Sequence, residues 1–114
     1  MALNIPQVRA LLTTIINDAY ELLVKGDTTD EQSYKICDEA TDNYLILLVG
    51  WHRFDRILGP CVHFRIYNGK VWLEEDGTEL NLGERLLEAG IAKDDIVLGF
   101  LNPEERPYSA YAVA

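Results

Sequence analysis

The chain has 114 residues, of which 19 are acidic and 10 are basic, so its formal net charge is −9. Its hydrophobic share of 48% and charged share of 25% are ordinary for a globular protein and exclude a disordered or fibrous chain. Proteins that bind nucleic acid do so mainly by neutralising phosphates with Lys and Arg. We therefore expect a single domain over residues 1–114 that binds free DNA poorly and attracts basic proteins.

The composition also indicates where the chain works. Its longest apolar run, residues 44–51, is far shorter than the roughly 20 residues that a membrane helix needs. The N-terminus has no basic start of the kind that opens a signal peptide. Cys37 and Cys61 each lie among apolar residues, where we expect reduced, core or near-core thiols. These features predict a cytoplasmic protein with no membrane contact, no metal and no cofactor.

The first predicted element is a long helix over residues 5–25. Asn4 is placed to cap its start, Pro6 suits its first turn and Gly26 can end it. Apolar residues recur along one stripe at helical spacing, which predicts packing on a sheet because the opposite face is not basic. The stripe comprises Val8, Leu11, Leu12, Ile15, Ile16, Ala19, Leu22 and Leu23.

Three strands are predicted next, after a polar loop at residues 26–33. Residues 34–41 alternate weakly, and a turn at Asp42-Asn43 leads into residues 44–51. The latter run is apolar on both faces, as in an inner strand that is covered from two sides. Residues 57–67 form the third strand, and Pro60 should lie near its start or at a bulge because it cannot donate to the ladder.

Asn68-Gly69 is the strongest hairpin signal in the chain. A two-residue turn there predicts one face with apolar side chains toward the core and one polar face. The core face pairs Ile66, Phe64 and Val62 with Val71, Leu73 and Glu75. The polar face pairs Tyr67 with Lys70, Arg65 with Trp72, His63 with Glu74 and Cys61 with Asp76.

The remaining pattern predicts a turn at Asp76-Gly77, a short helix at 82–89, a last strand at 96–100 and a packed apolar tail from residue 108. Asn81 and Glu84 form a plausible capping pair for the short helix. We therefore predict an α+β fold, in which the long helix packs on an antiparallel sheet of about five strands. The second face of the inner strand needs a cover, which either the short helix or a second subunit would supply, so a homodimer is plausible.

The polar face of the hairpin is the candidate site. Arg65 opposite Trp72 can form a cation–π pair, and exposed Trp and Arg are typical of binding hot spots. His63 opposite Glu74 resembles an acid–base pair but equally an ordinary cross-strand ion pair, and no nucleophile is placed beside it. We predict no catalytic residues and a partner-binding surface made of His63, Arg65, Trp72, Glu74 and Asp76.

Two other functions stay open. Arg53 and Arg56 lie in a basic and aromatic loop at residues 51–56 that could bind nucleic acid directly. Glu74 and Asp76 could converge on Mg²⁺, and with His63 they would make a metal-dependent hydrolase the third hypothesis.

Motifs along most of the chain resemble a known family. The first motif covers the predicted hairpin and reads Gly59-Pro60-Cys61-Val62-His63-Phe64-Arg65-Ile66-Tyr67-Asn68-Gly69-Lys70-Val71-Trp72. It leads into a second motif, Asp76-Gly77-Thr78-Glu79. Three further motifs follow: Leu87-Glu88-Ala89-Gly90-Ile91, Asp95-Ile96-Val97-Leu98-Gly99-Phe100 and Ala112-Val113-Ala114. One more, Val49-Gly50-Trp51, lies upstream of the hairpin. In order and spacing, residues 34–114 resemble the XisI family of fdxN-element excision controlling factors.

The resemblance implies a function that composition and periodicity do not. XisI-like proteins occur mainly in filamentous cyanobacteria and are named for the excision of a DNA element during cell differentiation, that of heterocysts. A separate site-specific recombinase cuts and joins the DNA, and XisI acts with XisH, a companion that looks like a nuclease-fold protein. The family has no established catalytic residues to carry over.

From this resemblance we expect a non-enzymatic accessory factor that binds a XisH-like protein and reaches DNA only through it. Direct DNA binding through Arg53 and Arg56, and an antitoxin-like neutraliser of a nuclease-fold partner, remain the alternatives.

Overall fold

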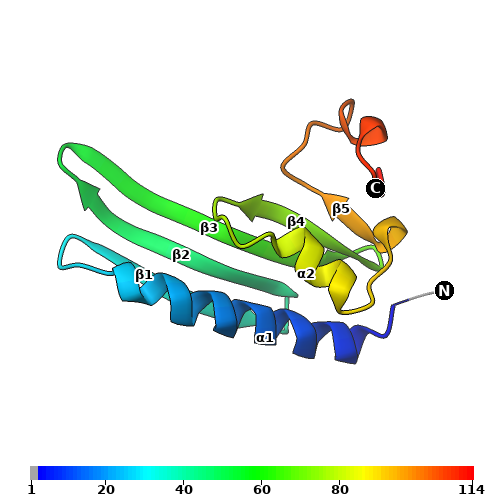
Figure 1. Cartoon of the computed structure of the whole chain (residues 1–114), viewed down its shortest axis with the longest axis horizontal. Coiled ribbons are helices and arrows are strands. Elements are labelled where there is room, and N and C mark those ends of the chain that lie inside the picture. The colour runs from blue at the N-terminus through cyan, green and yellow to red at the C-terminus, as the bar shows by residue number, and fades with distance from the viewer. Residues whose placement is uncertain (1–2) are drawn as a thin grey trace.

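The computed structural model describes residues 3–114 and has two helices on a five-stranded mixed sheet (Figure 1). The strands lie in chain order, and only the last pair is parallel. This confirms the predicted α+β fold, except that β5 was expected to be antiparallel. A parallel neighbour needs a crossover, which α2 provides. The elements are α1 (Ile5–Leu23), β1 (Glu31–Asp38), β2 (Asn43–His52), β3 (Asp55–Tyr67), β4 (Lys70–Asp76), α2 (Leu82–Glu88) and β5 (Ile96–Leu98).

The long helix forms as its sequence predicts. The side chain of Asn4 accepts a hydrogen bond from the backbone N–H of Gln7 at 3.1 Å, so it caps the first turn. A short 3₁₀ turn over Val24–Gly26 ends the helix. Most of the predicted stripe lies in the core: Leu11 and Leu23 pack partly buried against it, but the expected burial of Leu22 is wrong, since it is 54% exposed. The fully buried residues of α1 are Val8, Leu12, Ile15, Ile16 and Ala19. None of the helices among residues 3–114 is long and apolar enough to cross a membrane.

Both helices pack on the same face of the sheet. Leu82 and Leu86 of α2 belong to the same buried cluster as the stripe of α1. The sheet contributes Tyr44, Ile46, Val62, Phe64, Val71, Leu73 and Ile96 to this cluster. α1 runs along β1 and β2, and α2 lies beside β4 (Figure 1). Of the two covers expected for the second face of the inner strand, α2 is therefore excluded.

Two bulges set the register of the sheet. β2 pairs Ile46 with Val62 but Leu47 with Pro60, so the predicted irregularity next to Pro60 is confirmed and Cys61 is the extra residue. β3 pairs His63 with Glu75 and Phe64 with Leu73, so a second bulge leaves Glu74 as the extra residue.

The second bulge decides which predicted cross-strand pairs exist. The pairs Tyr67–Lys70 and Arg65–Trp72 are confirmed, next to the turn at Asn68-Gly69. The predicted pairs His63–Glu74 and Cys61–Asp76 are wrong. A two-residue turn fixes the register only as far as the first bulge, and a period-two pattern cannot reveal where an extra residue is inserted.

The predictions for the loop at residues 26–33, the cap of the short helix and the C-terminal tail can also be compared with the structure. β1 begins at Glu31, inside the predicted loop 26–33, where the Thr28 N–H donates to the Glu31 carbonyl at 2.9 Å. The predicted cap of the short helix is wrong, because Asn81 has φ 52° and makes no side-chain cap. The tail is packed only in part: Tyr111 contacts the core and Ala112 bridges to Val97, but Tyr108 is 92% exposed.

An ion pair ties α1 to the turn between β1 and β2. Arg9 donates from Nε to Asp42 Oδ1 at 2.8 Å and from Nη2 to Oδ2 at 3.1 Å. Tyr44 also donates its hydroxyl to Oδ1, at 3.0 Å. The hydrogen bonds from Arg9 lower the pKa of Asp42, and burial together with Asp42 raises the pKa of Tyr44 to about 12.

Gly50 allows the closest approach of backbones in the sheet. Its φ is +153°, and the Trp51 N–H donates to the Asp30 carbonyl at 2.9 Å. A Cβ at Gly50 would lie 2.0 Å from that same carbonyl oxygen. Only glycine therefore fits here, for both steric and conformational reasons.

We expect Gly50→Ala to lower the free energy of unfolding by about 2–4 kcal/mol, because it combines a strained φ with a backbone clash. Urea denaturation followed by far-UV circular dichroism measures this. Gly59→Ala is the matched control on the paired strand, since a Cβ there has nothing within 4 Å and its φ is not positive. Equal losses in the two variants would contradict the explanation.

Candidate functional site

Trp72 is at the centre of the predicted partner-binding surface, but it is only 7% exposed. Its Nε1–H donates to the Tyr67 carbonyl at 3.1 Å. The guanidinium of Arg65 lies 4.9 Å from the centroid of the Trp72 ring, and that of Arg106 lies 5.1 Å from it. The predicted cation–π pair is thus present, whereas the predicted exposure of Trp72 is wrong.

The C-terminal segment, residues 99–114, covers Trp72. The Gly99 N–H donates to the Leu73 carbonyl at 2.8 Å, and Arg106 Nε donates to the Leu101 carbonyl at 3.1 Å. A Cβ at Gly99 would lie 1.8 Å from Glu74 Oε1, so the absence of a side chain lets the segment pass this close. The apolar character of the tail predicted that this segment packs against the rest of the chain. No sequence pattern predicted that it packs on Trp72.

Glu74 and Arg65 form a pair beneath this segment. The bulge places Glu74 beside Arg65, whose Nε is 3.2 Å from Glu74 Oε2. The contact is electrostatic, because Arg65 Nε and Glu74 Oε1 are buried and have no hydrogen-bond partner among the described residues. Arg65 also lies 4.4 Å from the centroid of the Tyr67 ring. Arg65 is thus held by the charge of Glu74 and by the rings of Tyr67 and Trp72.

The other two predicted residues, His63 and Asp76, contact different parts of the structure from the Arg65–Glu74 pair. His63 Nε2 lies 2.8 Å from Asn43 Oδ1, and burial lowers the pKa of His63, as does Arg65. Asp76 pairs with the core residue Val62, which puts it on the helix-covered face of the sheet, and its Oδ1 accepts a hydrogen bond from the Thr78 hydroxyl at 2.9 Å. The five predicted residues therefore do not form one surface.

The same divergence bears on the metal hypothesis. The bulge places Glu74 and Asp76 on opposite faces, so the predicted convergence of their carboxylates is wrong. Among residues 3–114, no group of three or more His, Cys, Asp and Glu side chains could hold a metal ion. Both cysteines are free, and Cys37 is exposed rather than in or near the core.

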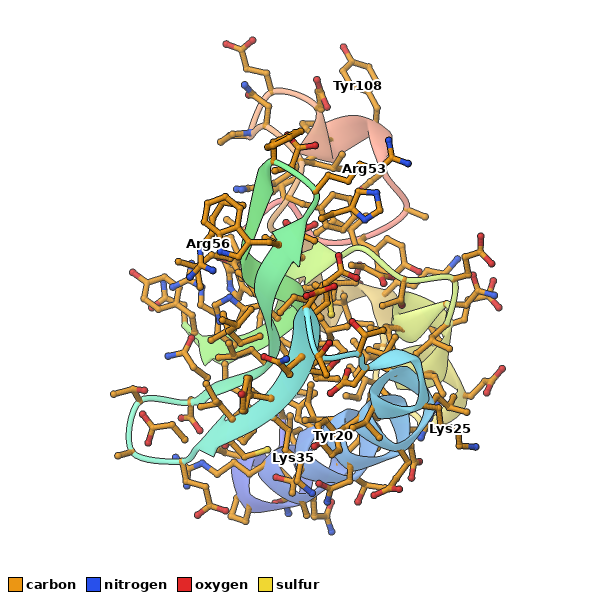
Figure 2. The ribbon with its side chains drawn as sticks, turned by 90° about the vertical axis from the view of Figure 1, so that its left-hand side faces the viewer. Tyr20, Lys25, Lys35, Arg53, Arg56 and Tyr108 are labelled. Atoms are coloured by element: carbon orange, nitrogen blue, oxygen red, sulfur yellow. The ribbon has the colours of Figure 1, made fainter. Side chains whose placement is uncertain are left out.

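The predicted basic loop is the tip of a long arm formed by β2 and β3. Arg53 stands in the turn with φ 58°, next to Phe54, which is 97% exposed. Arg56 lies 5.3 Å from the centroid of the Trp51 ring and donates to the Gly50 carbonyl at 3.1 Å. The two arginines extend to different sides of the arm (Figure 2), so the structure does not gather them into one patch.

A groove on the helix-covered side has a volume of about 380 Å³. It lies between the end of α1, the strands β1 to β3 and the segment after β4. Its apolar residues are Leu23, Leu48, Ile57, Cys61 and Leu80, and its acidic residues are Asp27, Glu31 and Glu79. No Lys, Arg or His is among its described lining residues. Burial raises the pKa of the Cys61 thiol, so Cys61 contributes as a small apolar group.

The groove was not predicted, because its residues come from four separate parts of the chain. Asp27 is fixed at its rim by Ser33, whose backbone N–H and hydroxyl donate to the carboxylate at 3.0 and 2.7 Å. The acidic residue Glu79 stands on the opposite rim and is exposed. An apolar floor with acidic rims suits a partner segment that carries both apolar and basic side chains.

Comparison with known proteins gives one consistent family. The family model described as XisI protein matches residues 3–113. The crystal structure of fdxN element excision controlling factor XisI from Anabaena variabilis ATCC 29413 is 36% identical, with a TM-score of 0.83 over 94% of this chain and 96% of that one. A XisI-like protein from the same organism is 34% identical, with a TM-score of 0.74 over 96% of this chain and 94% of that one. No curated protein matches the chain.

The environment of His63 predicts a pH dependence of stability. Burial lowers its folded-state pKa below the unfolded value of about 6.5, so acid protonates the unfolded state first. Stability should be constant above about pH 6.5 and fall below it, by less than the one-proton limit of about 1.4 kcal/mol per pH unit. Urea titrations of dilute protein at several pH values should show a shallower fall for His63→Gln. The exposed His52→Gln is the control, and an equal change in both would contradict the assignment.

The cover on Trp72 predicts a fluorescence change. In a Trp51→Phe background, Arg106→Ala should shift Trp72 emission to the red and increase its quenching by acrylamide. It removes one cation–π contact, so we expect a loss of about 0.5–1 kcal/mol in stability. Arg53→Ala, at the exposed tip, should change neither. Unchanged quenching in Arg106→Ala would show that Arg106 does not hold the cover.

Proposed function

The chain belongs to the XisI family, and from this premise we propose that it is a non-enzymatic accessory factor that binds a partner protein to control excision of a DNA element. The similar Anabaena protein is named an fdxN element excision controlling factor. The same role here places the chain in the cytoplasm, with the chromosome. A site-specific recombinase would do the chemistry, and this chain would act on that reaction through its partner.

The acidic groove is the observation that carries this proposal. It presents apolar side chains between Asp27, Glu31 and Glu79, and its described lining has no basic residue. The whole chain carries a charge of −9, which attracts a basic partner and repels DNA. A protein that handles nucleic acid offers such a basic surface, and we propose that the partner is a XisH-like protein of nuclease fold.

The contacts of His63, Arg65, Trp72 and Glu74 on the β3–β4 hairpin, which we call the hairpin cluster, support a non-enzymatic role. Its polar side chains are engaged with one another, since Arg65 pairs with Glu74 and His63 contacts Asn43. Trp72 is covered by the C-terminal segment. We therefore assign this cluster to holding the sheet and the C-terminal segment together, and the groove to the partner.

Co-expression tests this proposal. A tagged version is expressed with a XisH-like protein from the same organism and analysed by size-exclusion chromatography with light scattering. We expect a stoichiometric complex that weakens at high salt, because charged rim contacts are screened. The double variant Glu31→Lys/Glu79→Lys should weaken it roughly a hundredfold or more, since two attractive contacts become repulsive.

Glu104→Lys/Glu105→Lys is the matched control, because both residues are exposed in the C-terminal segment, away from the groove. An equal loss in the control would mean that net charge alone drives binding. No complex at low salt would contradict the proposal. Salt-dependent binding of duplex DNA by the chain alone would instead favour direct recognition. Loss of nuclease activity in a bound partner would identify a neutraliser of that partner.

A further inference from the structure

The second face of the sheet is open over β1, β2 and β3. Lys35 of β1 points to α1, with Nζ 2.9 Å from Asn17 Oδ1 and 5.3 Å from the centroid of the Tyr20 ring (Figure 2). Its neighbours Tyr34 and Ile36 therefore point to the other side, where they are 50% and 42% exposed. We call this side of the three strands the open face.

The register places an apolar surface on the open face. On β2, Tyr44 and Ile46 point to the core, so the alternate residues Leu45, Leu47 and Val49 point away from it. Three other large side chains are at least 48% exposed on the same face, at Trp51, Leu58 and Tyr67. A contiguous apolar surface of this kind, rimmed by polar residues, often marks an interaction site.

The rows across the three strands are known from the pairing. Asp38, Asn43 and Arg65 form one row, and Ile36, Leu45 and His63 form the next. Tyr34, Leu47 and Pro60 form the third row, and Gln32, Val49 and Leu58 form the fourth. The three inner rows of β2 are thus apolar, at Leu45, Leu47 and Val49, and Asp38 adds an acidic residue at the β1 end of the first row.

We propose that a second copy of this chain covers the open face, packing sheet on sheet about a twofold axis parallel to β2. Such an axis lays β2 on itself and β1 of each copy over β3 of the other. Each row of one copy then faces the same row of the other copy, with the order of the strands reversed. Tyr34 meets Pro60, Gln32 meets Leu58 and Ile36 meets His63 of the second copy, whereas Arg65 stays paired with Glu74 of its own chain.

Charge favours this occupant despite the net charge of −9 on each copy. In the four rows the charged side chains are Asp38 and Arg65, and Arg65 is already paired with Glu74, so apart from His63 the open face contributes one negative charge, that of Asp38. The acidic residues of the groove rim lie on the helix-covered side or at its edge. Two copies can therefore join through the one broad surface that does not carry the negative surplus.

The area of the open face determines how strongly we expect the two copies to bind each other. Three strands over eight residues span about 14 by 30 Å, roughly 400 Å² per copy, from the usual strand spacing and rise. Stable interfaces bury about 800 Å² per partner, and weak ones less. We therefore expect a reversible dimer that dissociates on dilution. The groove opens on the other side, so the dimer leaves both grooves free.

Light scattering after size-exclusion chromatography, over a range of concentrations, tests the proposal on the full chain. We expect the mass to rise from one copy to two, and Trp51 emission to shift to the blue as the face is covered. Leu58→Glu should raise the dissociation constant by roughly tenfold or more, because it buries an unpaired charge between the two sheets, opposite Gln32 and beside Val49. Leu22→Glu is the matched control, an exposed apolar residue of α1 that is 54% exposed and lies off the open face.

A cross-link keeps the proposal testable if Leu58→Glu fails to fold. Facing sheets pack about 10 Å apart, so a bifunctional thiol reagent of about that length should join Leu47→Cys to itself in a Cys37→Ser/Cys61→Ser background. Leu22→Cys in the same background should not react between copies. A chain that stays monomeric at every concentration would overturn the proposal. So would a dimer that Leu58→Glu leaves intact, or one that cross-links through Leu22→Cys but not through Leu47→Cys.

Discussion

Packing of both helices on one face of a five-stranded sheet is the constraint from which the other features follow. The stripe of α1 buries Leu12, Ile15 and Ile16 against β1 and β2. α2 then carries the chain from β4 to the parallel strand β5 over the same face, and adds Leu82 and Leu86 to one core. A helix can cover only the face on which its apolar stripe lies. The opposite face is left to the C-terminal segment and to whatever else binds there.

The C-terminal segment divides that opposite face into two parts. Over β4 and β5 it passes close to Glu74 at Gly99 and places Arg106 on Trp72, which makes an aromatic residue with hot-spot character part of the interior. It does not reach β1, β2 or the part of β3 that precedes Arg65, and Tyr34 and Leu58 stay exposed there. The absence of a side chain at Gly99 thus lets the segment cover β4 while the neighbouring strands stay available to a partner.

The two available surfaces differ in chemistry as well as in place. The groove has acidic rims at Glu31 and Glu79 and suits a basic protein. The open face is apolar and nearly neutral, and suits a copy of itself. Because they lie on opposite sides of the β2–β3 arm, one can be occupied without blocking the other. A dimer would then present two acidic grooves to a partner, which would strengthen binding to any partner with two such sites.

The sequence by itself determined the helix at 5–25, the inner strand at 44–51, the hairpin at Asn68-Gly69 and the family. These features depend on local periodicity, turn chemistry and motif order, which are properties of residues close together in the sequence. Only the tertiary structure decided that Glu74 forms a bulge, that Trp72 is covered and that β5 runs parallel. An extra residue in a ladder and a distant segment that packs over a side chain leave no periodic signal, because both arise from contacts between residues far apart in sequence.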